Sequence, residues 1–222
     1  MSNGVMIGVI TAGNLDMRCV QSLLATSQLG AASSIAIHQC GPYLDMGRNK
    51  MVDAFRTDER YAHCDRLLFI DSDIGFDPSL IQTLVDDDLP IVAGVYHSLF
   101  EQGIRPVVYE WTTDDRDLRV MVPIDSWGRP EGEHLVPVEA VGAGFLMVHR
   151  NVFEKFLEVY SPPNAWFGCD ILDGVELGED LAFCHRASQL GIPVVVDRRV
   201  QVSHSKGIVL QGPYKEASLS AT

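Results

Sequence analysis

The chain has 222 residues, of which 46% are hydrophobic and 21% are charged, and its formal net charge is −13. This length fits one domain, expected here over residues 1–222, and no run approaches the ~18 consecutive apolar residues of a membrane span. The negative charge makes nucleic acid or an anionic membrane an unfavourable partner.

The number and spacing of the cysteines indicate the redox state of the compartment in which the protein is expected. There are five, an odd number, and none forms a C-x-x-C pair. This usage favours a reducing cytoplasm over a disulfide framework or a zinc cage. The first residues also lack the basic segment of a signal peptide, so a cytoplasmic protein is expected.

Strand-like and helix-like segments alternate along the first half of the chain. A helix is predicted from Asn14, a good N-cap, to just before Gly30, and a short one is predicted with Asp77 as N-cap and Pro78 as its first residue. A third helix is predicted at 48–60. Apolar runs predict strands at 5–10, 35–38, 67–70 and 91–95. The alternation predicts an α/β fold with a Rossmann-like, mostly parallel central sheet flanked by helices.

The middle of the chain, residues 97–135, breaks this pattern. It carries scattered glycines and prolines, an acidic cluster and two tryptophans, Trp111 and Trp127. Residues 106–111 and 118–124 alternate enough to predict short antiparallel strands. We expect a small antiparallel insertion here, and a mobile tail over about 207–222, where the periodicity is weak.

Asp71-Ser72-Asp73 follows the most apolar predicted strand. Carboxylates at the carboxyl end of a central strand stand at the rim where open α/β sheets bind ligands. Hard oxygen ligands suit Mg²⁺ or Mn²⁺, and these ions suit a phosphate-bearing substrate. An isolated D-x-D can equally be a strand end that begins a turn.

Two signals in the second half leave similar alternatives open. Residues 141–150 form a predicted strand with Gly142 and Gly144, which either allow close approach to a ligand or make a bend before a helix. Asn151 and Glu154 in that helix resemble a capping box.

Gly178-Glu179-Asp180 opens another predicted helix, and His204 follows a strand predicted at 192–196. Acidic residues are ordinary in the first turn of a helix, and a lone histidine near a strand end is usually structural. Only convergence of these groups on one site would give them a chemical role.

In combination these segments resemble the GT-A fold glycosyltransferases, and especially their family-two-like nucleotide-sugar enzymes. The resemblance covers roughly residues 5–205. The segments that carry it are Asp71-Ser72-Asp73, Gly142-Ala143-Gly144-Phe145, Gly178-Glu179-Asp180-Leu181, His204 and the pair Arg48-Asn49.

The resemblance implies a metal-dependent glycosyltransferase of the hexosyltransferase type, with a nucleoside-diphosphate sugar as donor and a hydroxyl acceptor. Mn²⁺ or Mg²⁺ on the donor diphosphate would neutralise the leaving group. Asp180 would remove the proton of the acceptor hydroxyl, which implies inversion. The implied binding groups are the metal ligands Asp71, Asp73 and His204, the donor contacts Thr11, Ala12, Arg48 and Ser72, and Glu179 beside the base.

The chain departs from the family pattern at His38-Gln39-Cys40, where many members carry an acidic residue that binds the ribose or base. The identity of the donor nucleotide therefore stays open. Two other functions also stay open. A nucleotidyltransferase on a similar fold would normally show a glycine-rich loop with a basic residue after the first strand, and residues 11–14 lack the basic residue. The other alternative is a non-catalytic sugar-nucleotide-binding protein. The acceptor, whether saccharide, lipid, protein or modified nucleobase, is expected to bind near residues 97–135.

Overall fold

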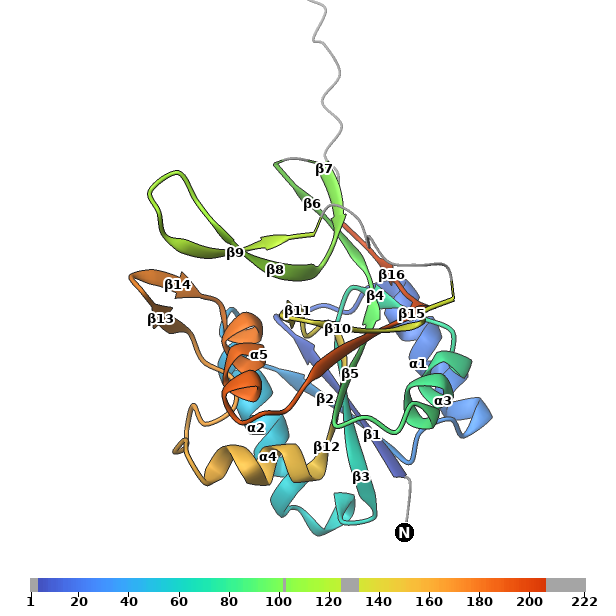
Figure 1. The fold of residues 1–222 in the computed structure, drawn as a ribbon. Coiled ribbons are helices and arrows are strands. Elements are labelled where there is room, and N and C mark those ends of the chain that lie inside the picture. Colours follow the sequence, from blue (N-terminus) through green and yellow to red (C-terminus); the bar gives the residue numbers. More distant parts are fainter. Residues whose placement is uncertain (1–3, 102, 125–131, 207–222) are drawn as a thin grey trace, which may run out of the picture.

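The computed structural model describes residues 4–101, 103–124 and 132–206, and a seven-stranded sheet forms its centre (Figure 1). The strand order is β10-β15-β5-β12-β3-β1-β2, and every strand except β12 and β10 runs in one direction. The predicted α/β fold with a mostly parallel sheet is therefore confirmed. The strands are β1 (Gly4–Thr11), β2 (Ser34–Gln39), β3 (Cys64–Asp71), β5 (Ile91–Val95), β10 (Leu135–Val138), β12 (Phe145–His149) and β15 (Val194–Gln201).

Helices cover both faces of this sheet. The side chains of α1 and α3 pack in one apolar cluster, and those of α2, α4 and α5 pack in another on the opposite face. The central strands supply side chains to both clusters, which explains why they read as continuous apolar runs. The helices are α1 (Met17–Leu29), α2 (Leu44–Thr57), α3 (Ser79–Asp86), α4 (Arg150–Leu157) and α5 (Glu179–Gln189), with a 3₁₀ turn at Glu59–Tyr61.

Helices α1 and α2 begin at residues other than those predicted. The N-cap of α1 is Asp16, whose carboxylate accepts from the Arg18 N–H at 2.8 Å, because the carbonyl of Asn14 accepts the Thr11 hydroxyl in the preceding turn. Helix α2 begins at Leu44, four residues before the predicted start. The predicted end of α1 is confirmed, since Gly30 takes a left-handed conformation with φ 64°.

The predicted capping box at Asn151 is wrong. The N-cap of α4 is His149, whose Nδ1 accepts from the Asn151 N–H at 3.2 Å. Glu154 does not reach back to the cap, because it forms a two-pronged ion pair with Arg56 at 2.8 and 2.9 Å.

The insertion forms small antiparallel sheets above the carboxyl edge of the central sheet (Figure 1). The predicted pairing of two strands there is confirmed by β8 (Val108–Thr113) and β9 (Arg119–Pro123). Trp127 and the predicted tail at 207–222 lie outside the described residues. The other short strands are β4 (Ile74–Gly75), β6 (His97–Phe100), β7 (Gly103–Pro106), β11 (Ala140–Val141), β13 (Asp170–Leu172), β14 (Val175–Leu177) and β16 (Ser203–His204). Within the described ranges, no helix is both long and apolar enough to cross a membrane.

Candidate functional site

A cleft of about 350 Å³ opens at the carboxyl edge of the central sheet. Its volume lies within the range of small-molecule sites. Its walls come from the ends of β1, β3 and β5, from the insertion and from the segment after β15. The lining residues are Ile10, Ala12, Leu44, Asp71, Ser72, Asp73, Tyr96, Ser98, Phe100, Val107, Tyr109, His204 and Lys206.

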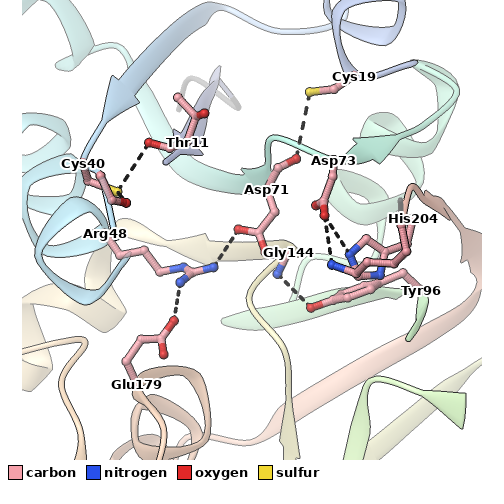
Figure 2. A network of polar contacts seen from close by, with 12 residues as sticks. Thr11, Cys19, Cys40, Arg48, Asp71, Asp73, Tyr96, Gly144, Glu179 and His204 are labelled. Carbon is pink, nitrogen blue, oxygen red and sulfur yellow. Dashed lines mark hydrogen bonds and ion pairs between the residues drawn. The ribbon is translucent and has the colours of Figure 1, made fainter. Parts of the chain in front are cut away.

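Asp73 and His204 meet in this cleft although 131 residues separate them. The short strands β4 and β16 pair in antiparallel register, with His204 opposite Ile74, and this places the histidine beside Asp73. His204 Nε2 lies 3.2 Å from Asp73 Oδ2 (Figure 2). Its Nδ1 lies 2.8 Å from the carbonyl oxygen of His97.

The His97 carbonyl decides how the His204 ring faces Asp73. A carbonyl oxygen only accepts, so Nδ1 carries the hydrogen, and a neutral ring then turns the Nε2 lone pair toward the carboxylate. Two acceptors face each other favourably only when the ring is protonated or a cation lies between them. The ring is held in place by the buried Tyr96, whose ring centroid lies 5.1 Å away at an angle of 86°.

The carboxylate of Asp73 has a second cationic neighbour. Lys206 Nζ lies 3.0 Å from Oδ2, the same oxygen that faces His204. Burial would raise the pKa of Asp73, but the hydrogen bonds from His204 and Lys206 outweigh it and lower the pKa to about 2. Asp73 is therefore ionised at any physiological pH.

The donor set of Asp73 and His204 fits a divalent ion. With bonds of about 2.1 Å, adjacent corners of an octahedron lie about 3 Å apart, close to the 3.2 Å between Oδ2 and Nε2. Among the residues described, no three His, Cys, Asp or Glu side chains come together as a metal-binding group. An ion here would therefore need further ligands from water and substrate, as Mg²⁺ commonly does.

Asp71, the third predicted metal ligand, faces a different partner. Its Oδ1 accepts from Arg48 Nη2 at 2.7 Å, and the other arm of the guanidinium is bonded to Glu179 (Figure 2). Arg48 is 2% exposed. Burial would lower the pKa of Arg48, but the carboxylates of Asp71 and Glu179 hold it above its usual value. The structure thus brings Asp73 and His204 together, and places Asp71 on Arg48.

Asp180 lies in the first turn of α5, next to Glu179. Burial first, and the neighbouring Glu179 second, raise the pKa of Asp180 to about 6, while the Arg48 charge opposes this. Its Oδ1 accepts from the Leu181 N–H at 2.9 Å. A carboxylate with this pKa can accept a proton near neutral pH, as a general base must.

The remaining predicted donor contacts take different positions. Ala12 and Ser72 line the cleft. The hydroxyl of Thr11 is used within the turn after β1, where it donates to the Asn14 carbonyl at 2.7 Å and accepts from the Gly13 N–H at 3.0 Å. For Thr11, and for the buried Arg48, a contact with the nucleoside stays a prediction.

Tyr96 is a site residue that the sequence analysis missed. Its hydroxyl accepts from the Gly144 N–H at 3.3 Å. A Cβ atom at Gly142 would lie 2.2 Å from that hydroxyl, and one at Gly144 would lie 3.0 Å from Asp71 Oδ2. The two glycines therefore admit Tyr96 and Asp71. The rule that selected Asp71, a polar residue directly after an apolar strand, also applies to Tyr96 after β5.

Comparison by sequence finds no match, either to a protein-family model or to a curated protein. Comparison by structure finds solved proteins with a similar fold. A197 from STIV matches with a TM-score of 0.51 and 15% identity, over 96% of this chain and 100% of A197. GalNAc-T7, crystallised with UDP, GalNAc and Mn²⁺, matches with a TM-score of 0.52 and 10% identity, over 90% of this chain. The chain has a GT-A-like fold.

These likenesses bear on the fold alone. The match spans 43% of the GalNAc-T7 chain. A glycosyltransferase involved in glycosylation of the major capsid of PBCV-1 aligns with a TM-score of only 0.36 and 11% identity, over 68% of this chain and 62% of that one.

Proposed function

We propose that this protein is a metal-dependent glycosyltransferase that moves a sugar from a nucleoside-diphosphate sugar to a hydroxyl acceptor. The observation that carries the proposal is the meeting of Asp73 and His204, 131 residues apart, in the cleft of a GT-A-like fold. Their oxygen and nitrogen donors suit a divalent ion of the Mn²⁺ type, and the cleft has room for a small-molecule donor.

Asp73 and His204 would hold the ion, and Asp71 is not required as a ligand. The bound ion would supply neutralisation of the charge that gathers on the departing nucleoside diphosphate. Asp71 keeps one oxygen on Arg48 and lines the cleft, where the carboxylate can accept a hydrogen bond from a donor hydroxyl.

Asp180 would take the proton of the acceptor hydroxyl. Its raised pKa, about 6, leaves it ionised at pH 7 and basic enough to receive a proton. Glu179 is fixed by Arg48, so its role in the proposal is to hold the start of α5 and to keep the pKa of Asp180 raised. A base on the acceptor side makes the reaction inverting.

Two features support a nucleotide-sugar donor. GalNAc-T7, which shares the fold, was crystallised with UDP. In this chain Ile10, Ala12 and Leu44 contribute apolar groups to the lining of the cleft, which suits the flat face of a base.

The proposal is tested by product release. The purified protein is incubated with Mn²⁺ and a panel of nucleoside-diphosphate sugars, and in parallel with nucleoside triphosphates and sugar phosphates. We expect Mn²⁺-dependent release of a nucleoside diphosphate from at least one donor, and its loss in Asp73→Asn. Asp53→Asn, which changes an exposed carboxylate on α2, is the charge-matched control.

Each other result has a definite meaning. Release of pyrophosphate instead would establish a nucleotidyltransferase. Donor binding without any release would establish a non-catalytic sugar-nucleotide-binding protein. Equal release by wild type and Asp73→Asn would refute the metal assignment.

A further inference from the structure

Lys206 lines the cleft and carries a positive charge that has no role in the proposed chemistry. It lies two residues after His204, and its ammonium nitrogen is 3.0 Å from Asp73 Oδ2. The lysine side chain is 51% exposed and the carboxylate 31% exposed. Such a pair contributes little to stability, so it can break when a better partner arrives.

A divalent ion would compete with Lys206 for the same atom. Oδ2 is the Asp73 oxygen nearest to both Lys206 Nζ and His204 Nε2. An ion that joins the carboxylate to the imidazole must take this oxygen. An ammonium group and a divalent ion repel each other at such short range, so Lys206 would have to leave Asp73 when the ion binds.

The displaced ammonium has an obvious new partner if a diphosphate enters with the ion. Of the described residues that line the cleft, only His204 and Lys206 carry basic side chains. Arg48 is buried and already engaged by two carboxylates. A released nucleoside diphosphate, like inorganic pyrophosphate, carries more negative charge than one divalent ion neutralises, and the net charge of −13 adds repulsion.

We propose that Lys206 occupies the cation position of Asp73 in the ligand-free protein, yields it to the divalent ion, and then binds the diphosphate. This proposal rests on the proposed function for the identity of the diphosphate, but its test uses no sugar nucleotide. It assigns Lys206 two effects of opposite sign. The lysine weakens binding of the ion alone and strengthens binding of the ion together with a diphosphate.

The test measures binding of Mn²⁺ alone, and of inorganic pyrophosphate in the presence of saturating Mn²⁺, by calorimetry. Lys206→Met removes the ammonium and keeps an unbranched apolar stem. Lys155→Met is the control, because it removes the same charge from an exposed site on α4. A thermal melt of each variant verifies folding, which an exposed lysine is not expected to alter.

We expect Lys206→Met to bind Mn²⁺ about two- to fivefold more tightly than wild type, in keeping with the small strength of an exposed ion pair. We expect it to bind pyrophosphate roughly three- to tenfold more weakly, because a charge-assisted contact is lost. Lys206→Arg should retain most of the pyrophosphate affinity, and Lys155→Met should match wild type in both measurements.

If Lys206→Met binds Mn²⁺ as tightly as wild type or more weakly, Lys206 does not compete with the ion for Asp73. The same conclusion follows if neither wild type nor the variant binds Mn²⁺. Unchanged pyrophosphate affinity would overturn the diphosphate contact. If both effects are seen but no donor releases a nucleoside diphosphate, the role of Lys206 is supported and the proposed function is refuted.

Discussion

Asp71 and Asp73 stand two residues apart, yet their surroundings differ sharply. Asp71 belongs to an arginine cluster, Arg48, Asp71 and Glu179, built around a guanidinium that is 2% exposed. Asp73 belongs to a lysine cluster, Asp73, His204 and Lys206, in which the lysine side chain is half exposed. Each carboxylate has a cation, but only one of those cations is free to leave.

Burial accounts for the difference. Removing one partner of a buried ion pair costs about 3–5 kcal/mol, because a charge is left without water or a counter-ion. Breaking an exposed pair costs about 0–1 kcal/mol. The arginine cluster is therefore scaffold, and it anchors the start of α5 to the end of β3. The lysine cluster is exchangeable, and a ligand can enter there.

The largest effect is expected from Asp180, which lies beside the arginine cluster. Asp180→Asn keeps the shape of the side chain and removes the base. Turnover should fall by roughly 10²- to 10⁴-fold, the usual contribution of a general base, with donor binding nearly unchanged. Wild-type kcat/KM should fall below about pH 6, where the carboxylate becomes protonated. Near-normal turnover in the variant would exclude the role.

The stability of the same variant distinguishes a base from a helix cap. The folded protein holds the Asp180 proton up to a pKa of about 6, above the ordinary value of 3.8. Wild type therefore loses stability as pH rises from about 4 to about 6. Asp180→Asn has no such loss, so its melting temperature relative to wild type should be higher at pH 7 than at pH 4. A carboxylate that acted mainly on the helix dipole would give the opposite trend.

The arginine cluster itself is tested by Arg48→Met. This change leaves Asp71 and Glu179 without their shared cation and should lower the free energy of unfolding by about 3–5 kcal/mol, measured by urea denaturation. Arg60→Met is the matched control, because Arg60 is also paired with an aspartate but lies exposed; it should unfold close to wild type. A small effect of Arg48→Met would mean that the cluster is not scaffold.

The strands and part of the lysine cluster could be predicted from the sequence, whereas the arginine cluster could not. The strands β1, β3 and β5 were predictable because burial on both faces leaves uninterrupted apolar runs. The family resemblance implied that Asp73 and His204 share one site, and their side chains lie 3.2 Å apart, while their role as metal ligands stays a prediction.

The partners of Arg48 were not predictable. They lie 23 and 131 residues away, and no local pattern encodes which carboxylate a buried arginine will meet. The predicted start of α1 was wrong for a local reason. Asn14 and Asp16 are both good N-caps, and the Thr11 hydroxyl bond to the Asn14 carbonyl favours the later one. His149 as a cap lies outside the usual residue preferences.

The metal assignment distinguishes the two aspartates directly. Mn²⁺ at about 100 times its Kd would stabilise the folded state by about 2.7 kcal/mol, or roughly 5–10 °C in melting temperature for a chain of this size. Asp73→Asn should abolish this shift, whereas Asp71→Asn should melt lower but retain most of it. Equal loss of the Mn²⁺ shift in both variants would show that Asp71 leaves Arg48 and joins the ion.

The smallest effect is expected on the acceptor side, at Trp111 of β8. Its half-buried ring has the Arg119 guanidinium 4.3 Å from its centroid and meets the His185 ring of α5 at 6.0 Å. Trp111 therefore stands between the insertion and the helix that carries Asp180. Sugar rings stack on such surfaces, and an aromatic contact contributes about 0.5–1.5 kcal/mol.

Trp111→Ala should raise the acceptor KM by about 2- to 10-fold, with unchanged donor hydrolysis and a melting temperature near wild type. Arg119→Ala is the companion variant, because it removes the cation over the ring but keeps the ring itself; it should change the acceptor KM less. If Trp111→Ala instead lost about 3–5 kcal/mol of stability and its folded fraction bound acceptor normally, the tryptophan would be a packing residue of the insertion. The acceptor would then bind a surface that does not include Trp111.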